Sequence, residues 1–328
     1  RRRITHGHIV EQSMRIVFLA SGAFAQPTLR WLAQSQHEVA LVVTQPAKGS
    51  GRGQHLTRTP VRAMADELGL ETLEAENVNA PDVVAQLRSL EARVGLVIAF
   101  GQKLGAELLG SMPGGCINLH ASLLPKYRGA APINWAVARG EEKTGCAVFR
   151  ITNRMDAGPI LVTRWTEIKP EETAGELHDR LAGIGVDAMK AAVELFDGDN
   201  IPAGTPQNER EATLAPKLTK ADGVVDFDRP AADVAHHICG MTPWPGASAR
   251  FEAREGRWEN VTFLRARRAQ DPYAPADPPG TIDARRYVAA RDGFVEILEI
   301  KPSSGRSMTW QDYVNGRHVS PGDRFTVP

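Results

Sequence analysis

The feature that most constrains the fold is an alternation of short apolar runs and helix-period stretches along residues 14–196. The runs at 15–20, 38–44 and 94–100 are rich in Val, Ile and Leu. The last of these is apolar throughout, which is typical of a strand buried on both faces of a parallel sheet. Strands that alternate with helices form parallel, doubly wound sheets. The sequence therefore predicts an α/β domain with a mostly parallel sheet.

The other elements expected in this domain follow from the same patterns. Thr59 and Pro60 are predicted to open a helix, Thr59 as the N-cap and Pro60 at the first helical position, with Gly69 closing it. Further strands are expected at 115–120, 146–151 and 159–168, and further helices at 27–34 and 173–196.

The composition changes after residue 196. A stretch rich in Gly, Pro and Asp predicts a linker over 197–215, and the short runs beyond it, separated by turn signals, predict a small β-barrel over 216–328. Strands are expected there at 247–251, 261–265, 281–282 and 294–300, with helices at 230–240 and 309–315. Residues 1–13 are basic and lack periodicity, and we interpret them as an extension outside the fold rather than as a secretion signal, because they contain no apolar core segment.

Composition excludes several classes of protein. The formal net charge is zero, which gives no global electrostatic signal for nucleic acid or membrane binding. The three cysteines have no metal-ligand spacing, so we expect buried, reduced thiols and no metal site. No apolar run approaches the ~18 residues of a membrane span. These observations predict a cytoplasmic protein, and the lack of an apolar surface stripe predicts a monomer.

The strongest candidate site combines Asn118, His120 and Asp156. Asn118 and His120 lie two residues apart at the end of a predicted strand, so their side chains share a face and Leu119 points to the other. The chain then enters a loop through Ser122, a position where open α/β sheets place their chemistry.

An amide, an imidazole and a carboxylate are what the transfer of an acyl group to an amine requires. Asn118 and a protonated His120 can donate hydrogen bonds to the developing oxyanion, and losing one such donor typically costs ~10²–10³ in turnover. Asp156 can stabilise the imidazolium and, through a water, accept the proton that the amine loses. Each residue also has an ordinary structural explanation, a strand-end histidine or a turn-capping carboxylate. Their conjunction favours a catalytic site.

The stretches 118–129 (NLHASLLPKYRG), 130–132 and 155–158 resemble the formyltransferases that use 10-formyltetrahydrofolate. Within that family, residues 44–46 running into 51–53, and the Pro-Trp-Pro at 243–245, are similar to the branch that formylates the α-amino group of methionyl initiator tRNA. The resemblance implies a Rossmann-like formyltransferase domain over 14–196 and an OB-like barrel that helps to hold tRNA.

The resemblance also implies roles for individual residues. Asn118, His120 and Asp156 would be catalytic, and Arg52 would lie on a mobile loop at the acceptor end of the tRNA. The folate site would be lined by Ser122, Leu123, Leu124, Pro125, Phe100 and Gly101. In one departure, Ala20, Ser21 and Gly22 follow the first strand where the family usually has Gly-Thr-Pro, which leaves the acceptor-side contacts open.

The loop at 45–58 is a candidate tRNA contact. It contains Lys48, Arg52 and Arg58, three glycines and no acidic residue. Glycines allow close approach to a ligand, and the basic side chains suit phosphate. Such a loop can also be an ordinary solvent-exposed loop that binds nothing. It is neither a P-loop nor a dinucleotide fingerprint, which argues against a dinucleotide-dependent oxidoreductase.

The barrel gives a weaker signal. Residues 207–328 contain 17 Lys and Arg and 17 Asp and Glu, although arginines cluster at 265–268 and 285–286. These clusters fit either a phosphate-binding stripe or solvated strand faces. Two other functions therefore stay open, a sugar-nucleotide N-formyltransferase that uses the same donor and a non-catalytic RNA-binding protein.

Overall fold

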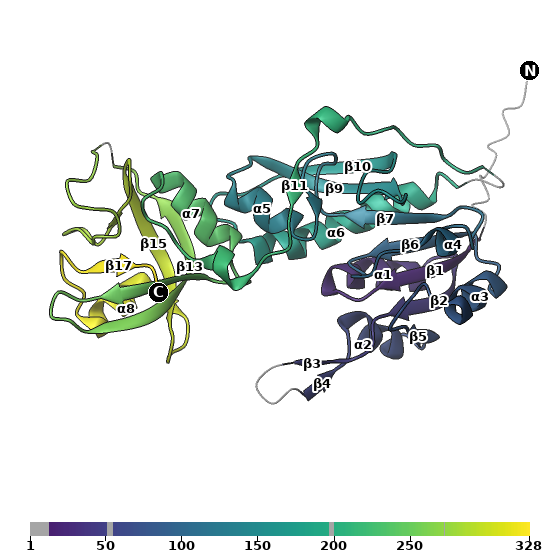
Figure 1. The fold of residues 1–328 in the computed structure, drawn as a ribbon, viewed down its shortest axis with the longest axis horizontal. Coiled ribbons are helices and arrows are strands. Elements are labelled where there is room, and N and C mark those ends of the chain that lie inside the picture. The colour runs from purple at the N-terminus through teal and green to yellow at the C-terminus, as the bar shows by residue number, and fades with distance from the viewer. Residues whose placement is uncertain (1–12, 51–54, 197–199, 272) are drawn as a thin grey trace, which may run out of the picture. The chain divides into compact units, whose positions relative to one another are not determined.

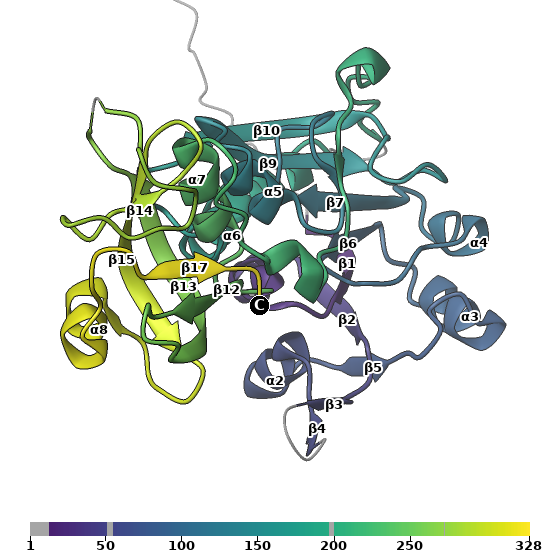
Figure 2. The same cartoon turned by 60° about the vertical axis from the view of Figure 1, so that its left-hand side comes forward.

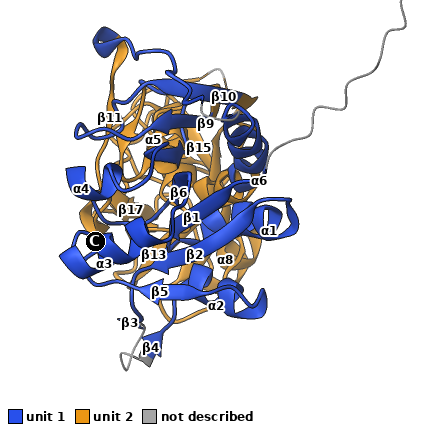
Figure 3. Cartoon of the chain, turned by 90° about the vertical axis from the view of Figure 1, so that its right-hand side faces the viewer, with its two compact units in different colours: residues 1–125, 146–164, 181–210 blue, residues 126–145, 165–180, 211–328 orange. Residues whose placement is uncertain are grey.

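The structure is a computed structural model that describes residues 13–50, 55–196, 200–271 and 273–328. Its elements, labelled in Figure 1, group into two compact units that interleave along the chain (Figure 3). Unit 1 comprises residues 1–125, 146–164 and 181–210, and unit 2 comprises residues 126–145, 165–180 and 211–328. Of the residues predicted to lie outside the fold, 1–12 fall outside this description.

A seven-stranded sheet has the strand order β10-β9-β7-β6-β1-β2-β5. The pairs β1–β2, β1–β6, β2–β5 and β6–β7 are parallel, whereas β7 and β9 are antiparallel. The predicted mostly parallel α/β sheet is confirmed. The strands are β1 (Arg15–Ala20), β2 (Glu38–Thr44), β5 (Thr72–Glu74), β6 (Val94–Ile98), β7 (Cys116–His120), β9 (Lys143–Arg150) and β10 (Ile160–Glu167).

The strand predicted over 94–100 ends two residues early, at Ile98, because Ala99 has a left-handed φ of +44°. The helix predicted after Thr59 is confirmed: the Thr59 side chain accepts a hydrogen bond from the backbone N–H of Arg62, and Gly69 follows the helix with a φ of +67°. The helices around this sheet are α1 (Gln26–Gln34), α2 (Pro60–Glu67), α3 (Pro81–Ser89), α4 (Ala106–Leu109) and α6 (Ala174–Val193), with a short 3₁₀ turn η1 (Ala23–Ala25).

The basic stretch at 45–58 is partly regular. Strands β3 (Lys48–Ser50) and β4 (His55–Thr57) pair antiparallel, with Lys48 opposite Thr57. The segment predicted as a loop therefore contains two paired strands, and residues 51–54, which include Arg52, lie outside the described residues.

The predicted small barrel is confirmed in unit 2 (Figure 2). The sheet runs in the order β14-β15-β13-β12-β17, with β16 paired to β15. Thr281 bridges to Arg324 in β17 and Ile282 bridges to Val288 in β14, so the segment between them nearly closes the sheet. The strands are β12 (Ala247–Glu252), β13 (Trp258–Arg268), β14 (Val288–Ala289), β15 (Phe294–Pro302), β16 (Met308–Thr309) and β17 (Arg324–Thr326).

Aromatic side chains fill the barrel. Phe263 and Phe325 meet edge to face with ring centroids 4.9 Å apart, and Phe251 packs on Tyr313 at 5.7 Å. Such pairs add ~0.5–1.5 kcal/mol beyond the area that they bury. Helices α7 (Ala231–Gly240) and α8 (Trp310–Arg317) supply more of this core, and the remaining elements of the chain are α5 (Pro132–Ala138), β8 (Arg128–Gly129), β11 (Leu214–Ala215), η2 (Glu209–Glu211) and η3 (Lys220–Gly223).

Candidate active site

Strand β7 places Asn118 and His120 at the carboxyl end of the sheet. Val97 of β6 is the register partner of Asn118, and Ala147 of β9 is the partner of His120. His120 is 7% exposed and Asn118 is partly buried. Because side chains alternate along a strand, the amide and the imidazole lie on one face.

The opposite face of β7 packs on α6. Leu119 is buried, and a Cβ added at Gly185 of α6 would lie 2.6 Å from the Leu119 Cδ2 atom. A larger residue at Gly185 would force the Leu119 side chain to move. The strand that carries both polar side chains therefore packs closely on α6.

Asp156 reaches His120 from the turn after β9. The His120 Nδ1 and Asp156 Oδ2 atoms are 3.9 Å apart, which is an ion-pair distance but too long for a hydrogen bond. The structure thus brings the predicted carboxylate and imidazole together, although 36 positions separate them in the chain (156 − 120).

Two contacts of the backbone hold this turn. The Gln207 Nε2 group donates hydrogen bonds of 2.8 Å to the carbonyls of Asp156 and Gly158. A Cβ added at Gly158 would lie 1.7 Å from the carbonyl oxygen of Arg150, so no other residue fits there. Asp156 itself has a left-handed φ of +49°. Gln207 was not among the predicted site residues, because nothing in its local sequence pattern indicates a distant partner.

The three side chains have complementary capacities. Within the described residues, the Asn118 side-chain amide has no hydrogen-bond partner, and it can therefore donate to a ligand. Donors that are fixed before the reaction stabilise a developing oxyanion most effectively. The site holds one amide donor, one imidazole and one carboxylate at the edge of the sheet.

The segment after His120 is largely buried. Ser122 is fully buried, Leu124 packs on Ala147 and Phe149, and Leu123 and Pro125 are partly exposed. The segment thus follows the site directly and is packed firmly into unit 1.

Phe100 and Gly101 follow β6 at the same edge of the sheet. The Phe100 side chain is 2% exposed and belongs to the core cluster beside β1 and β2, whereas Gly101 is exposed with a φ of +81°. The Phe100 carbonyl accepts hydrogen bonds from Ser21 Oγ at 3.2 Å and from Gln45 Nε2 at 2.7 Å. Phe100 therefore shapes this edge through its backbone.

The predicted tRNA contacts are only partly described. Arg58 is exposed and forms an ion pair of 3.0 Å with Asp66. Lys48 lies in β3, and Arg52 lies outside the described residues.

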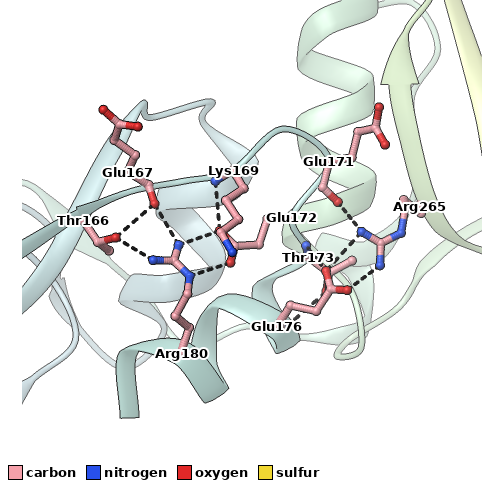
Figure 4. Close-up of polar contacts among 9 residues, drawn as sticks. All are labelled: Thr166, Glu167, Lys169, Glu171, Glu172, Thr173, Glu176, Arg180 and Arg265. Carbon is pink, nitrogen blue, oxygen red and sulfur yellow. Dashed lines mark hydrogen bonds and ion pairs between the residues drawn. The ribbon is translucent and has the colours of Figure 1, made fainter. Parts of the chain in front are cut away.

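The arginine clusters of the barrel pair with carboxylates inside unit 2. Arg265 bonds the Glu176 carboxylate at 2.6 and 3.1 Å and the Glu171 carbonyl at 2.6 Å (Figure 4). These bonds, with the backbone and hydroxyl of Thr173, lower the pKa of Glu176 to about 2. Arg267 pairs with both Glu171 and Glu296. The positive charges of Arg265 and Arg267 are therefore neutralised locally.

A second fork in Figure 4 stabilises the same loop. Arg180 donates two hydrogen bonds of 2.8 Å to the buried carboxylate of Glu172, which also accepts the backbone N–H of Lys169. Thr173 and Glu176 then form a reciprocal capping pair at the start of α6. These contacts explain the acidic composition of residues 171–176 as structural.

Burial raises the pKa of the Cys116 and Cys146 thiols to about 12, and Cys239 is buried as well. The prediction of buried thiols is confirmed, and protonated thiols of this kind are chemically inert. Within the described ranges, no group of three His, Cys, Asp or Glu side chains could hold a metal ion. No helix in the same ranges is long and apolar enough to cross a membrane.

An amide, an imidazole and a carboxylate lie at the edge of a mostly parallel sheet, a set of groups that can chemically serve acyl transfer. Residues 14–193 match the formyl transferase family, and residues 217–318 match the formyl transferase C-terminal domain. The chain therefore belongs to the formyl transferase family, as the sequence predicted.

Two relatives match nearly the full chain. The methionyl-tRNA formyltransferase of Solibacter usitatus (strain Ellin6076) is 38% identical over 315 residues, which cover 95% of this chain and 98% of that protein. The methionyl-tRNA formyltransferase of Methylobacterium sp. (strain 4-46) is 38% identical over 95% of this chain and 99% of its own length.

Solved structures share the fold at lower identity. HypX from Aquifex aeolicus, in complex with tetrahydrofolic acid, matches with a TM-score of 0.59 and 17% identity. The match covers 92% of this chain and 47% of the HypX chain. WlaRD, a sugar 3N-formyl transferase, matches with a TM-score of 0.59 and 14% identity. The match covers 90% of this chain and 100% of the WlaRD chain.

Proposed function

We propose that this protein transfers a formyl group from 10-formyltetrahydrofolate to the α-amino group of methionyl initiator tRNA. The observation that carries the proposal is the convergence of Asn118, His120 and Asp156 at the sheet edge of a formyl transferase. The near full-length similarity to relatives named methionyl-tRNA formyltransferase supports the acceptor. The neighbour that binds tetrahydrofolic acid supports a fold able to hold a folate.

The proposed reaction balances without a covalent enzyme intermediate. The amine nitrogen attacks the formyl carbon, and the carbonyl electron pair moves onto oxygen. The bond from carbon to the folate N10 then breaks, so N10 gains a proton and the amine loses one. Because the amine is itself the nucleophile, no Ser or Cys nucleophile is needed.

Each side chain then has one task. The Asn118 amide and a protonated His120 donate hydrogen bonds to the oxyanion. Asp156, 3.9 Å from the imidazole, orients it and accepts the amine proton through a water. Gln207 acts through Asp156 and is a positioning residue.

The remaining predicted contacts are part of the same proposal. Ser122, Leu123, Leu124 and Pro125, with the turn at Phe100 and Gly101, would line the folate site. Arg52, Lys48 and Arg58 would guide the acceptor end of the tRNA. We also expect a cytoplasmic monomer with a catalytic segment at 14–196, a linker at 197–215 and a tRNA-holding barrel at 216–328.

A transfer assay with 10-formyltetrahydrofolate and methionyl initiator tRNA tests the proposal. We expect formylmethionyl-tRNA from the parent and a loss of at least ~10² in kcat for Asn118→Ala. Release of tetrahydrofolate with an amino-sugar nucleotide, and none with tRNA, would favour the sugar-nucleotide N-formyltransferase instead. Folate-independent tRNA binding without turnover would favour the RNA-binding protein.

A further inference from the structure

In the sheet of unit 1, the order in which the chain adds strands reverses between β1 and β6. β1 pairs with β2 on one side and with β6 on the other, and the chain builds outward from β1 in both directions. Open α/β sheets bind ligands outside the carboxyl ends of their strands at such a switch point. Here Ser21 follows β1 and Ala99 follows β6, so these two residues lie at the switch point.

The turn after β6 is strained. Ala99 has a φ of +44°, a left-handed conformation that is unfavourable for a residue with a Cβ. Strain of this kind persists where surrounding contacts over-determine the backbone, and it gathers at functional sites. The backbone N–H groups of Ser21 and Gly22 both donate to the Ala99 carbonyl, at 3.3 and 3.1 Å.

Ser21 holds the next carbonyl as well. Its hydroxyl donates to the Phe100 carbonyl at 3.2 Å and accepts from the Gln45 backbone N–H at 3.1 Å and the Thr44 hydroxyl at 3.3 Å. A serine hydroxyl offers one donor and two acceptor positions, so all three are used. Ser21 therefore joins the ends of β1, β2 and β6.

The direction of this hydrogen-bond chain can be assigned. The Thr44 and Thr59 hydroxyls are 2.8 Å apart, and either could donate by distance alone. Thr44 gives its only hydroxyl proton to Ser21, so Thr59 must donate to Thr44. The relay thus runs from the N-cap of α2 through the fully buried Thr44 to Ser21 and the Phe100 carbonyl.

The clamped turn lies beside the catalytic residues. Asn118 is the register partner of Val97, two residues before Ala99, and parallel strands are ~4.8 Å apart. Gly101 is exposed, and the Gln45 side chain lies so close to it that an added Cβ would clash with the Nε2 atom. A flat ligand whose reactive group reaches Asn118 would pass over this turn.

We propose that Ser21 is a positioning residue for the formyl donor. Its hydroxyl clamps the turn at Ala99, Phe100 and Gly101 in the conformation that receives the folate, before the ligand binds. This inference rests on the proposed function for the identity of the donor. It assigns a task to the hydroxyl that Ser21 supplies in the segment 20–22, which differs from the usual Gly-Thr-Pro but keeps a hydroxyl.

Binding of tetrahydrofolate to the full chain, measured by isothermal titration calorimetry, tests the inference. For Ser21→Ala we expect the Kd to rise about tenfold, because the variant loses the hydroxyl that holds the turn. A tenfold change in Kd corresponds to ~1.4 kcal/mol of binding free energy. Ser21→Thr keeps the hydroxyl and should restore the affinity of the parent. In the transfer assay, Ser21→Ala should raise the KM for the donor and leave kcat within about twofold.

Ser35→Ala is the matched control. The Ser35 hydroxyl also donates to a carbonyl, that of Leu32 at 2.7 Å, and also accepts a backbone N–H, that of His37 at 3.2 Å, but at the end of α1. Removing the Ser35 hydroxyl should change the Kd for tetrahydrofolate by less than about twofold. If Ser21→Ala does not fold by circular dichroism, Gln45→Met removes the other donor to the Phe100 carbonyl and should also weaken binding.

The outcomes separate this inference from the proposed function. Parent-like affinity in Ser21→Ala, or in Gln45→Met where that variant is used, would overturn the clamp, as would a loss that Ser21→Thr does not restore. A parent that binds tetrahydrofolate but leaves methionyl-tRNA unformylated would overturn the acceptor, while the affinities still decide the role of Ser21. A parent that binds no tetrahydrofolate would overturn both.

Discussion

The carboxyl edge of the sheet in unit 1 and strand β13 of the barrel in unit 2 both carry polar residues, but the partners of these residues differ. At the sheet edge, the Asn118 amide has no partner within the described residues, and His120 faces Asp156 at 3.9 Å. On the barrel, Arg265 is bound to Glu176 and Glu171 at hydrogen-bond distances. The Asn118 amide thus retains capacity for a ligand, whereas the saturated Arg265 contributes to the fold.

The largest effect is expected at the sheet edge. His120→Ala should lower kcat at least ~10²-fold while the protein stays folded, since it removes an oxyanion donor. His178→Ala is the control, because His178 also faces a carboxylate, Asp179 at 2.9 Å, but on the exposed surface of α6. Steady-state formyl transfer measures both. A fully active His120→Ala would refute the mechanism.

The next effect separates positioning from catalysis. Gln207→Ala removes both hydrogen bonds to the Asp156 turn and should lower kcat about tenfold, the equivalent of ~1.4 kcal/mol in the barrier. Gln311→Ala, which removes a side-chain bond to Asn315 on α8, should leave kcat unchanged. Equal activity of the two variants would show that the turn holds Asp156 without Gln207.

On the barrel, the comparison predicts an effect on stability rather than on chemistry. Arg265→Ala should lower the free energy of unfolding by about 1 kcal/mol, near the upper end for an exposed pair, because the arginine binds two partners. The kcat should stay near that of the parent. Urea denaturation measures the first quantity. An unchanged stability together with a raised KM for tRNA would instead make Arg265 a phosphate contact.

The smallest effect concerns pH. The pKa of Glu176 is lowered from 4.5 to about 2, mainly by the Arg265 hydrogen bonds. A lowered carboxyl pKa stabilises the folded state above the unfolded pKa, and this stability is lost as the pH falls from about 4.5 towards 2. The stability difference between the parent and Glu176→Gln should shrink over that interval in urea denaturation. A difference that grows on acidification would reverse the assignment.

The predictable parts of the site share one property, local periodicity. Asn118 and His120 could be placed on one face because strand side chains alternate. Gln207 could not be found, because it is 51 residues from Asp156 and its hydrogen bonds follow no pattern. Likewise, the partners of Arg265 lie 94 and 89 residues away, so the arginine cluster was open to two interpretations.

The end of β6 likewise could not be predicted from the local sequence pattern. An apolar run from residue 94 to 100 predicts a strand throughout, yet Ala99 turns into a left-handed conformation that alanine rarely adopts. The contacts that hold this turn come from Ser21 and Gly22, which follow β1, and from Gln45, which follows β2. Composition carries no record of such contacts.

By itself, the sequence determined the mostly parallel sheet, the small barrel, the buried thiols and the family, because periodicity, turn residues and the motif around Asn118 are local properties of the chain. The tertiary structure alone decided which groups are engaged: the turn that carries Asp156, the relay that ends at Ser21 and the carboxylates that neutralise Arg265. These depend on hydrogen bonds between distant segments, whose geometry exists only after the chain has folded.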